Sequence, residues 1–175
     1  MRYYLFVIVL FFVTGCEKYK DPAPFSDPRI VNKYCNIPSA INFNWDFPGI
    51  EDNSTCIFPA QLYNGIYKFY DTTYGSVGDT IATDSFLLTF TQIDSTRLRI
   101  EGFCTGTPIT ATANRFYKFT IDSLVKNGQI LCGSADTIEG MGTKADIYDT
   151  TTLRMSYEIS NDTLKIRHAG MGIKQ

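Results

Sequence analysis

The chain has 175 residues, of which 44% are hydrophobic and 19% charged, and its formal net charge at pH 7 is −2. A mildly acidic chain does not provide the basic surface that nucleic acids favour, so we expect no nucleic-acid partner. The length suits a single domain with its own core.

The first 15 residues have the layout of a secretory signal peptide. Arg2 supplies a positive start, and residues 3–13 form an uninterrupted apolar run that is too short to span a bilayer as a helix. The small residues Thr14 and Gly15 then precede Cys16. We therefore interpret residues 1–15 as a signal peptide and expect cleavage before Cys16.

The quartet Val13-Thr14-Gly15-Cys16 resembles the lipobox of bacterial lipoproteins. In that family a peptidase cuts before the cysteine, whose sulfur and new amino group then carry acyl chains. The resemblance implies that Cys16 is lipidated and that the membrane is a partner, at the outer membrane or the cell surface. The polar, proline-containing residues 16–34 would then be the tether. The alternative is an ordinary signal peptide or membrane anchor with an incidental cysteine.

Four cysteines remain once Cys16 is assigned to lipid. An exported protein is in an oxidising environment, so an even set indicates disulfides. Of the three pairings, we favour Cys35–Cys56 with Cys104–Cys132. The four cysteines are too far apart in sequence to form the closely spaced pairs, such as Cys-x₂-Cys, that bind zinc. We expect no metal and no cofactor.

Residues 35–60 form a disulfide-stapled segment that we expect to pack on the β domain. Within it, Ile41, Phe43, Trp45 and Phe47 alternate with polar residues, which predicts a half-buried strand or extended segment. These aromatic rings have two interpretations. We favour burial, because large aromatic residues mostly serve as core. The alternative is an exposed platform for a sugar or an apolar ligand, with Trp45, Phe43 and Tyr67 as the candidate ligand-facing residues.

The pattern of apolar and polar residues over 61–175 predicts an all-β domain. Apolar and polar residues alternate in six stretches, at 65–71, 85–93, 97–103, 115–121, 152–160 and 163–168. Asn127-Gly128 is a strong hairpin signal, because both residues tolerate positive φ. We expect an antiparallel meander of about seven strands that closes as a small barrel or a two-sheet sandwich, since its edges have to be covered.

The opening of the first strand, Gly65-Ile66-Tyr67, resembles the lipocalin-like (calycin-like) lipoproteins of Bacteroidota. Their first strand opens with Gly-x-Trp, whereas this chain has tyrosine at the third position. The resemblance implies a lipocalin-like barrel and a bound ligand.

Eight of the thirteen aspartates are followed by serine or threonine. Such pairs favour turns before strands, because their side chains bond nearby backbone groups. They also resemble the O-glycan acceptor motif of exported Bacteroidota proteins. That resemblance makes Thr80, Ser123, Thr137 and Thr163 candidate O-glycosylation sites.

Catalytic motifs are absent from the sequence. His168 is the only histidine, and a lone histidine at a strand end is typical of a structural residue. Residues 71–84 and 133–150 are predicted as long loops, most simply solvated connections. We therefore expect a non-enzymatic envelope binding module for an apolar small molecule, a glycan or a protein. The alternatives are a structural accessory subunit of an envelope complex and a carboxylate-based hydrolase.

Lipidation is tested by replacing Cys16 with serine. We expect Cys16→Ser to abolish metabolic labelling with a fatty acid and retention in the membrane fraction, because no acyl chain is then attached. The measurement is label incorporation together with fractionation. Equal membrane retention of wild type and variant would contradict the assignment.

Overall fold

The computed structural model describes residues 27–175, except residues 127 and 162. The predicted signal peptide and Cys16 lie outside the described residues, as do Asn127 of the predicted hairpin and the first part of the tether.

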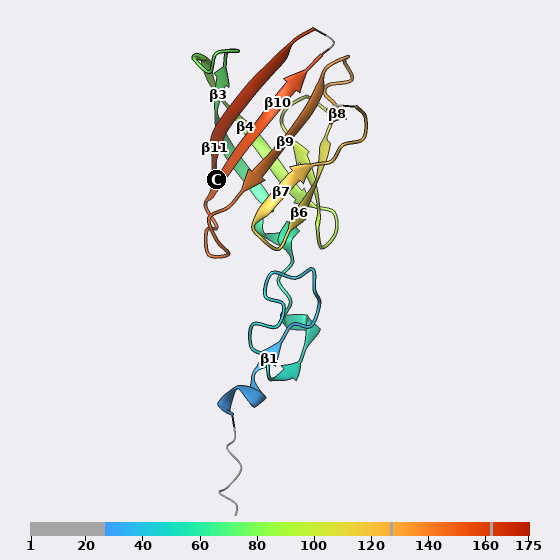
Figure 1. Cartoon of the computed structure of the whole chain (residues 1–175), viewed down its shortest axis with the longest axis vertical. Coiled ribbons are helices and arrows are strands. Elements are labelled where there is room, and N and C mark those ends of the chain that lie inside the picture. Colours follow the sequence, from blue (N-terminus) through green and yellow to red (C-terminus); the bar gives the residue numbers. More distant parts are fainter. Residues whose placement is uncertain (1–26, 127, 162) are drawn as a thin grey trace, which may run out of the picture.

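A slender N-terminal part and a β-barrel make up the described chain (Figure 1). The N-terminal part contains η1 (Pro28–Val31), β1 (Lys33–Tyr34), β2 (Ile50–Glu51), η2 (Asn53–Thr55) and η3 (Pro59–Leu62). The barrel part contains β3 (Gly65–Tyr74), β4 (Thr80–Gln92), β5 (Arg97–Glu101), β6 (Ile109–Asn114), β7 (Lys118–Ile121), β8 (Gln129–Ile130), β9 (Thr137–Thr143), β10 (Thr152–Ser160) and β11 (Lys165–Lys174).

Eight of the described strands close into an antiparallel barrel. Neighbours pair in the order β3-β4-β5-β6-β7-β9-β10-β11, and β11 returns to pair with β3. The short β8 pairs with β9 beyond the end of β7. The all-β prediction is confirmed, and of its two alternatives the structure adopts the barrel.

Aromatic side chains fill the barrel near the N-terminal part. Tyr63, Tyr67, Phe69, Phe90 and Phe119 are essentially inaccessible to solvent. The Tyr63 ring meets Phe119 edge-on at 5.1 Å between centroids, and Tyr67 meets Phe90 in the same way at 5.5 Å. Tyr67, a candidate ligand-facing residue, is therefore part of the packed core and is not exposed to a ligand.

The two stretches predicted as long loops contain strand instead. β3 extends to Tyr74 and β4 begins at Thr80, so only a tight turn joins them. β9 lies within the second stretch, and glycines on it conceal the alternation. A Cβ placed on Gly142 would overlap the Phe119 ring, so the large ring on β7 fills the space of a missing side chain on β9.

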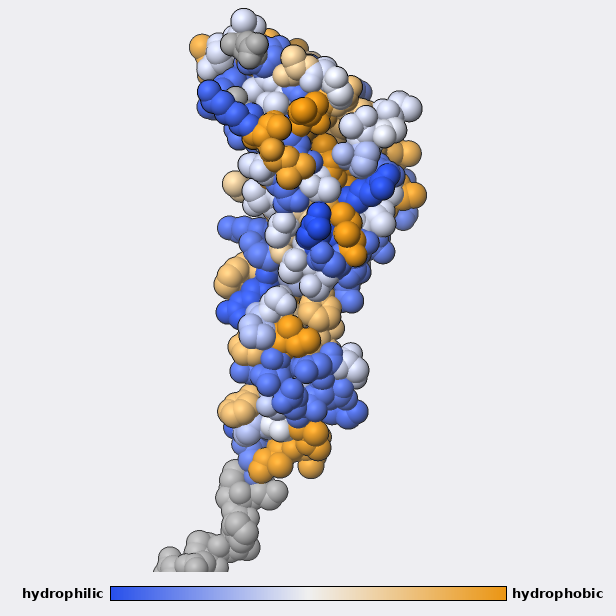
Figure 2. All heavy atoms as spheres, turned by 90° about the vertical axis from the view of Figure 1, so that its right-hand side faces the viewer, coloured by the Kyte–Doolittle hydropathy of each residue, from blue (hydrophilic) through white to orange (hydrophobic). Residues whose placement is uncertain are grey.

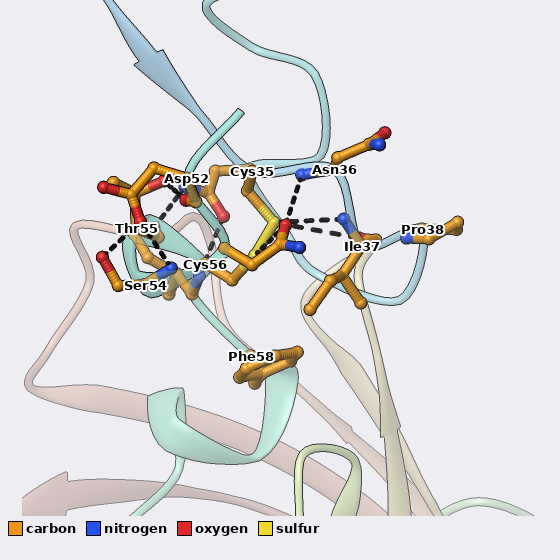
Figure 3. Close-up of a disulfide and its surroundings, with 12 residues drawn as sticks. Cys35, Asn36, Ile37, Pro38, Asp52, Ser54, Thr55, Cys56 and Phe58 are labelled. Atoms are coloured by element: carbon orange, nitrogen blue, oxygen red, sulfur yellow. Dashed lines mark hydrogen bonds between the residues drawn. A yellow bond between two sulfur atoms is a disulfide. The ribbon is translucent and has the colours of Figure 1, made fainter. Parts of the chain in front are cut away.

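Residues 27–58 form a small unit at one end of the barrel, which we call the tip segment (Figure 1). The Cys35–Cys56 disulfide closes it, with 4.9 Å between the Cα atoms (Figure 3). Beside the disulfide, the Asp52 carboxylate caps η2 by accepting the Ser54 backbone N–H at 3.0 Å. The second disulfide, Cys104–Cys132, has a Cα separation of 5.3 Å. Both predicted pairings are confirmed.

Arg115 joins the tip segment to the barrel. Its guanidinium donates to the Pro38 carbonyl at 3.5 Å and lies 6.0 Å from the centre of the Phe43 ring. Phe43 is half-buried at this contact.

The expectation that Trp45 is buried is wrong, because its side chain is 53% exposed. No strand forms over residues 41–47, although Phe43 makes one bridge to Cys35. Two tight turns replace it: the Trp45 N–H donates to the Asn42 carbonyl and the Phe47 N–H to the Asn44 carbonyl. The tip segment is too small to enclose all of its aromatic rings, so alternation here does not mark a buried face.

Alkaline stability tests the packing of Tyr67. Burial, and to a smaller extent the charge of Asp149, raises the pKa of Tyr67 to about 12, whereas an unfolded tyrosine titrates near 10.0. Between these values the folded state binds more protons than the unfolded state, so the free energy of unfolding falls as the pH rises. We expect Tyr67→Phe to reduce this fall by about 2 kcal/mol at pH 12.

The measurement is urea unfolding from pH 8 to 12. The matched control is Tyr148→Phe, which makes the same chemical change at a side chain that is 83% exposed. At pH 8, Tyr67→Phe should cost little stability, because the buried hydroxyl has no hydrogen-bond partner in the described structure. Parallel pH profiles of wild type and Tyr67→Phe would show that folding does not change the pKa of Tyr67.

Candidate functional site

Two rows of outward-facing side chains cross the barrel wall, one from β7 to β3 and the other from β9 to β3. Strand register sets the first row, which consists of Lys118, Thr143, Arg154, Met171 and Tyr70. The adjacent row consists of Met141, Ser156, Ala169 and Thr72. Because neighbouring positions in a row are about 5 Å apart, side chains from strands distant in sequence form one continuous surface.

These rows form a groove of about 710 Å³ on the outside of the barrel, which we call the outer groove. Its middle is lined by small and hydroxyl-bearing residues, namely Thr72, Thr143, Ser156 and Ala169. Longer side chains surround them: Tyr70, Tyr74, Met141, Met171, Lys118 and Arg154. A groove of this size accommodates a ligand of several hundred daltons.

The outer groove carries positive charge on a chain that is acidic overall. Lys118 and Arg154 line it, and no aspartate or glutamate does. Within the described residues neither cation forms a salt bridge, whereas Glu158 nearby is paired with Lys165 at 2.7 Å. The groove therefore favours a ligand with negative charge.

A second hollow opens where β7 and β9 separate. The pairing of β7 with β9 ends at Thr120 and Met141. The next residue of β9 that is paired on this side is Ile138, whose partner is Gln129 of β8. The resulting wall cleft has a volume of about 400 Å³, and Tyr157 and His168 line it. Met141 and Ser156 line both hollows, so the wall cleft continues the outer groove.

His168 is held by a buried carboxylate beside the wall cleft. Its Nδ1 lies 2.7 Å from Asp71 Oδ2, and the two side chains are 13% and 5% exposed. The Tyr157 ring stacks on the imidazole at 4.6 Å between centroids and 7° between planes. Burial raises the pKa of Tyr157 and the Asp71 charge adds to this, so the phenol keeps its proton.

This arrangement fixes one edge of the imidazole. Asp71 occupies Nδ1, and among the described residues no hydrogen bond is made to Nε2. Thr73 approaches Nδ1 at 3.4 Å, which is the only hydroxyl contact with His168 in the described chain. For this histidine to activate a nucleophile, the nucleophile would have to lie at Nε2. Because Asp71 fixes the ring through Nδ1, His168 presents a hydrogen-bonding group of fixed orientation beside the wall cleft.

The predicted site residues lie elsewhere. Trp45 and Phe43 are in the tip segment, and Tyr67 is inside the barrel. Of the candidate glycosylation sites, Thr80, Ser123 and Thr163 are exposed, whereas Thr137 is half-buried and donates to the Ser160 carbonyl at 3.3 Å. The residues of the outer groove were missed because their only common property is that they face outward, and some of them, such as Met141 and Met171, lie where polar and apolar residues do not alternate.

Comparisons with protein-family models, with curated proteins and with solved structures find no match to this chain. In the part of the chain that the structure describes, no group of three or more His, Cys, Asp or Glu side chains is placed to hold a metal ion. The described helices include none long and apolar enough to cross a membrane.

The Asp71–His168 pair is tested by a double-mutant cycle. We expect His168→Ala to cost about 3 kcal/mol or more, because it leaves the Asp71 carboxylate buried without its partner. With Asp71→Ala and the double variant, the coupling energy should be about 1–3 kcal/mol.

The control cycle uses Arg99 and Glu101, whose side chains are about half exposed and 2.7 Å apart. That surface pair should couple by less than about 1 kcal/mol. Urea unfolding measures both cycles. Equal coupling in the two pairs would show that Asp71 does not hold His168 as described.

Proposed function

We propose that this chain is a lipid-anchored binding protein of the cell envelope, at the outer membrane or the cell surface, and that its outer groove binds an acidic glycan. The anchor rests on the lipobox-like quartet that ends at Cys16. The observation that supports the ligand is the lining of the outer groove: hydroxyl groups in the middle, tyrosines at one side, and two cations with no carboxylate.

Each part of this lining suits a charged sugar. Hydroxyls of Thr72, Thr143 and Ser156 exchange hydrogen bonds with sugar hydroxyls. The rings of Tyr70 and Tyr74 offer an apolar surface with a polar tip. Lys118 and Arg154 attract carboxylates or sulfates, and one strand separates them in the register. Their backbones are thus about 10 Å apart, so a ligand with more than one acidic group engages both cations.

An apolar small molecule has less support. Large aromatic side chains occupy the barrel interior around Tyr67 and Phe90, where a lipocalin-like barrel would hold such a ligand. The accessory-subunit alternative is favoured by one observation, the exposed apolar side chains of Leu124, Val125 and Ile130 around β8. Apolar atoms are also visible on this side of the molecule in Figure 2.

The hydrolase alternative is favoured by a different observation. Glu139 and Glu158 face each other across β9 and β10, and both line the wall cleft. Lys165 lowers the pKa of Glu158, so in such a pair Glu158 would be the ionised nucleophile or base and Glu139 would have to be the general acid. We propose binding without hydrolysis, because Lys118 and Arg154 line the outer groove, whereas the two glutamates line only the wall cleft.

Glycan binding is tested by calorimetric titration with oligosaccharides of uronic acids and with neutral oligosaccharides of the same length. We expect binding of the acidic series only, weakened by added salt because the contacts are exposed to solvent. Arg154→Glu should weaken binding at least about tenfold, since a charge-assisted hydrogen bond contributes about 1.5–3 kcal/mol.

The matched control is Arg97→Glu. It makes the same charge change at an exposed β5 position that does not line the outer groove, and it should leave binding unchanged. Chromatography of the incubated sugars reports hydrolysis in the same experiment. Equal binding of neutral and acidic sugars, or unaltered binding by Arg154→Glu, would refute the proposed site.

A further inference from the structure

The tip segment exposes large apolar side chains at the end of the molecule that leads to Cys16. They are Ile30, Val31, Trp45, Phe47 and Ile50, and we call them the tip cluster. Each is at least half exposed, and Val31 reaches 73%. Figure 2 shows apolar atoms gathered at this end of the described chain. A concentration of this kind indicates an interaction surface, whereas single exposed apolar residues need no explanation.

Local structure holds the two stretches that supply the cluster next to each other. β1 and β2 pair Lys33 with Ile50, and the Ile50 N–H donates to the Asn32 carbonyl at 2.7 Å. The Phe47 ring meets Tyr34 edge-on at 5.7 Å. The Cys35–Cys56 disulfide closes the same unit, so the cluster is displayed on a fixed scaffold.

The basic residues beside the cluster are already neutralised. Arg29 pairs with Asp27 at 2.7 Å, and Lys33 pairs with Asp52 at 2.8 Å. These pairs remove the positive charges that a nearby acidic partner would need. The surface then carries the apolar side chains of the tip cluster and two exposed carboxylates, Asp46 and Glu51, so it offers no net positive charge. It also holds the single tryptophan, the residue type that is enriched where a bilayer meets water.

The length of chain between Cys16 and the tip segment limits the distance between the tip cluster and the membrane anchor. Residues 17–26 lie between the lipidation site, Cys16, and the first described residue, Asp27. The eleven steps from Cys16 to Asp27 span no more than about 36–40 Å when the chain is fully extended. If Cys16 is acylated, the first described residue therefore stays within about 40 Å of the bilayer that holds the acyl chains.

We infer that the tip cluster lies on the lipid surface in which Cys16 is anchored, with Trp45 at the level of the headgroups. This inference rests on the proposed lipid anchor. The contact would place the tip segment on the bilayer and hold the barrel, with its outer groove, away from it.

The test uses the mature lipoprotein reconstituted in phosphatidylcholine vesicles. Trp45 is the only tryptophan, so its fluorescence reports on the tip cluster alone. We expect blue-shifted emission, protection from acrylamide, and quenching by lipids brominated near the headgroup that exceeds quenching by lipids brominated near the chain end. The double variant Val31→Asp, Phe47→Asp should lose all three effects while still sedimenting with the vesicles.

The matched control is Val77→Asp, at a side chain that is 87% exposed in the turn between β3 and β4. It should behave as the wild type does. Thermal melting checks that each variant is folded. Acylated, vesicle-bound protein whose Trp45 emits as in water would overturn the inference and leave the anchor intact. Mature protein without acyl chains, detected by mass spectrometry, would overturn both.

Discussion

The pairing of β3 with β11 is the interaction on which the rest of the structure depends. It runs from Tyr67 opposite Lys174 to Tyr74 opposite Arg167, and it joins the first barrel strand to the last. Without it, the meander would present two long edges of unpaired backbone groups. With it, the side-chain rows of the outer groove continue from β10 and β11 onto β3, and Asp71 reaches His168 across the seam.

Glycine makes the barrel closure compatible with an aromatic interior. Gly170 lies opposite Asp71 on β3, and a Cβ there would meet the Phe69 ring. A Cβ on Gly142 would likewise overlap the ring of Phe119. Small residues on β9 and β11 therefore leave room for the large rings of β3 and β7 in the buried core.

Strands that carry one apolar residue at every second position were predictable, as in β4, where Leu88 and Phe90 face inward. β6 and β9 were not, because their inward positions hold Ala111, Ala113 and Gly142, which leave little hydrophobic signal. The outer groove and the Asp71–His168 pair were out of reach for another reason. They depend on register between strands far apart in the chain, and alternation sets the face of a residue but not its neighbour.

The four cysteines of the described chain pair in order along the sequence: the first, Cys35, with the second, Cys56, and the third, Cys104, with the fourth, Cys132. The two covalent loops are consecutive, so neither encloses or crosses the other. A chain that emerges N-terminus first presents each native pair before the following cysteine appears. Oxidation in the order of emergence therefore produces the correct connectivity, and proofreading by disulfide exchange has little to correct. In this respect the connectivity would suit the export that we propose.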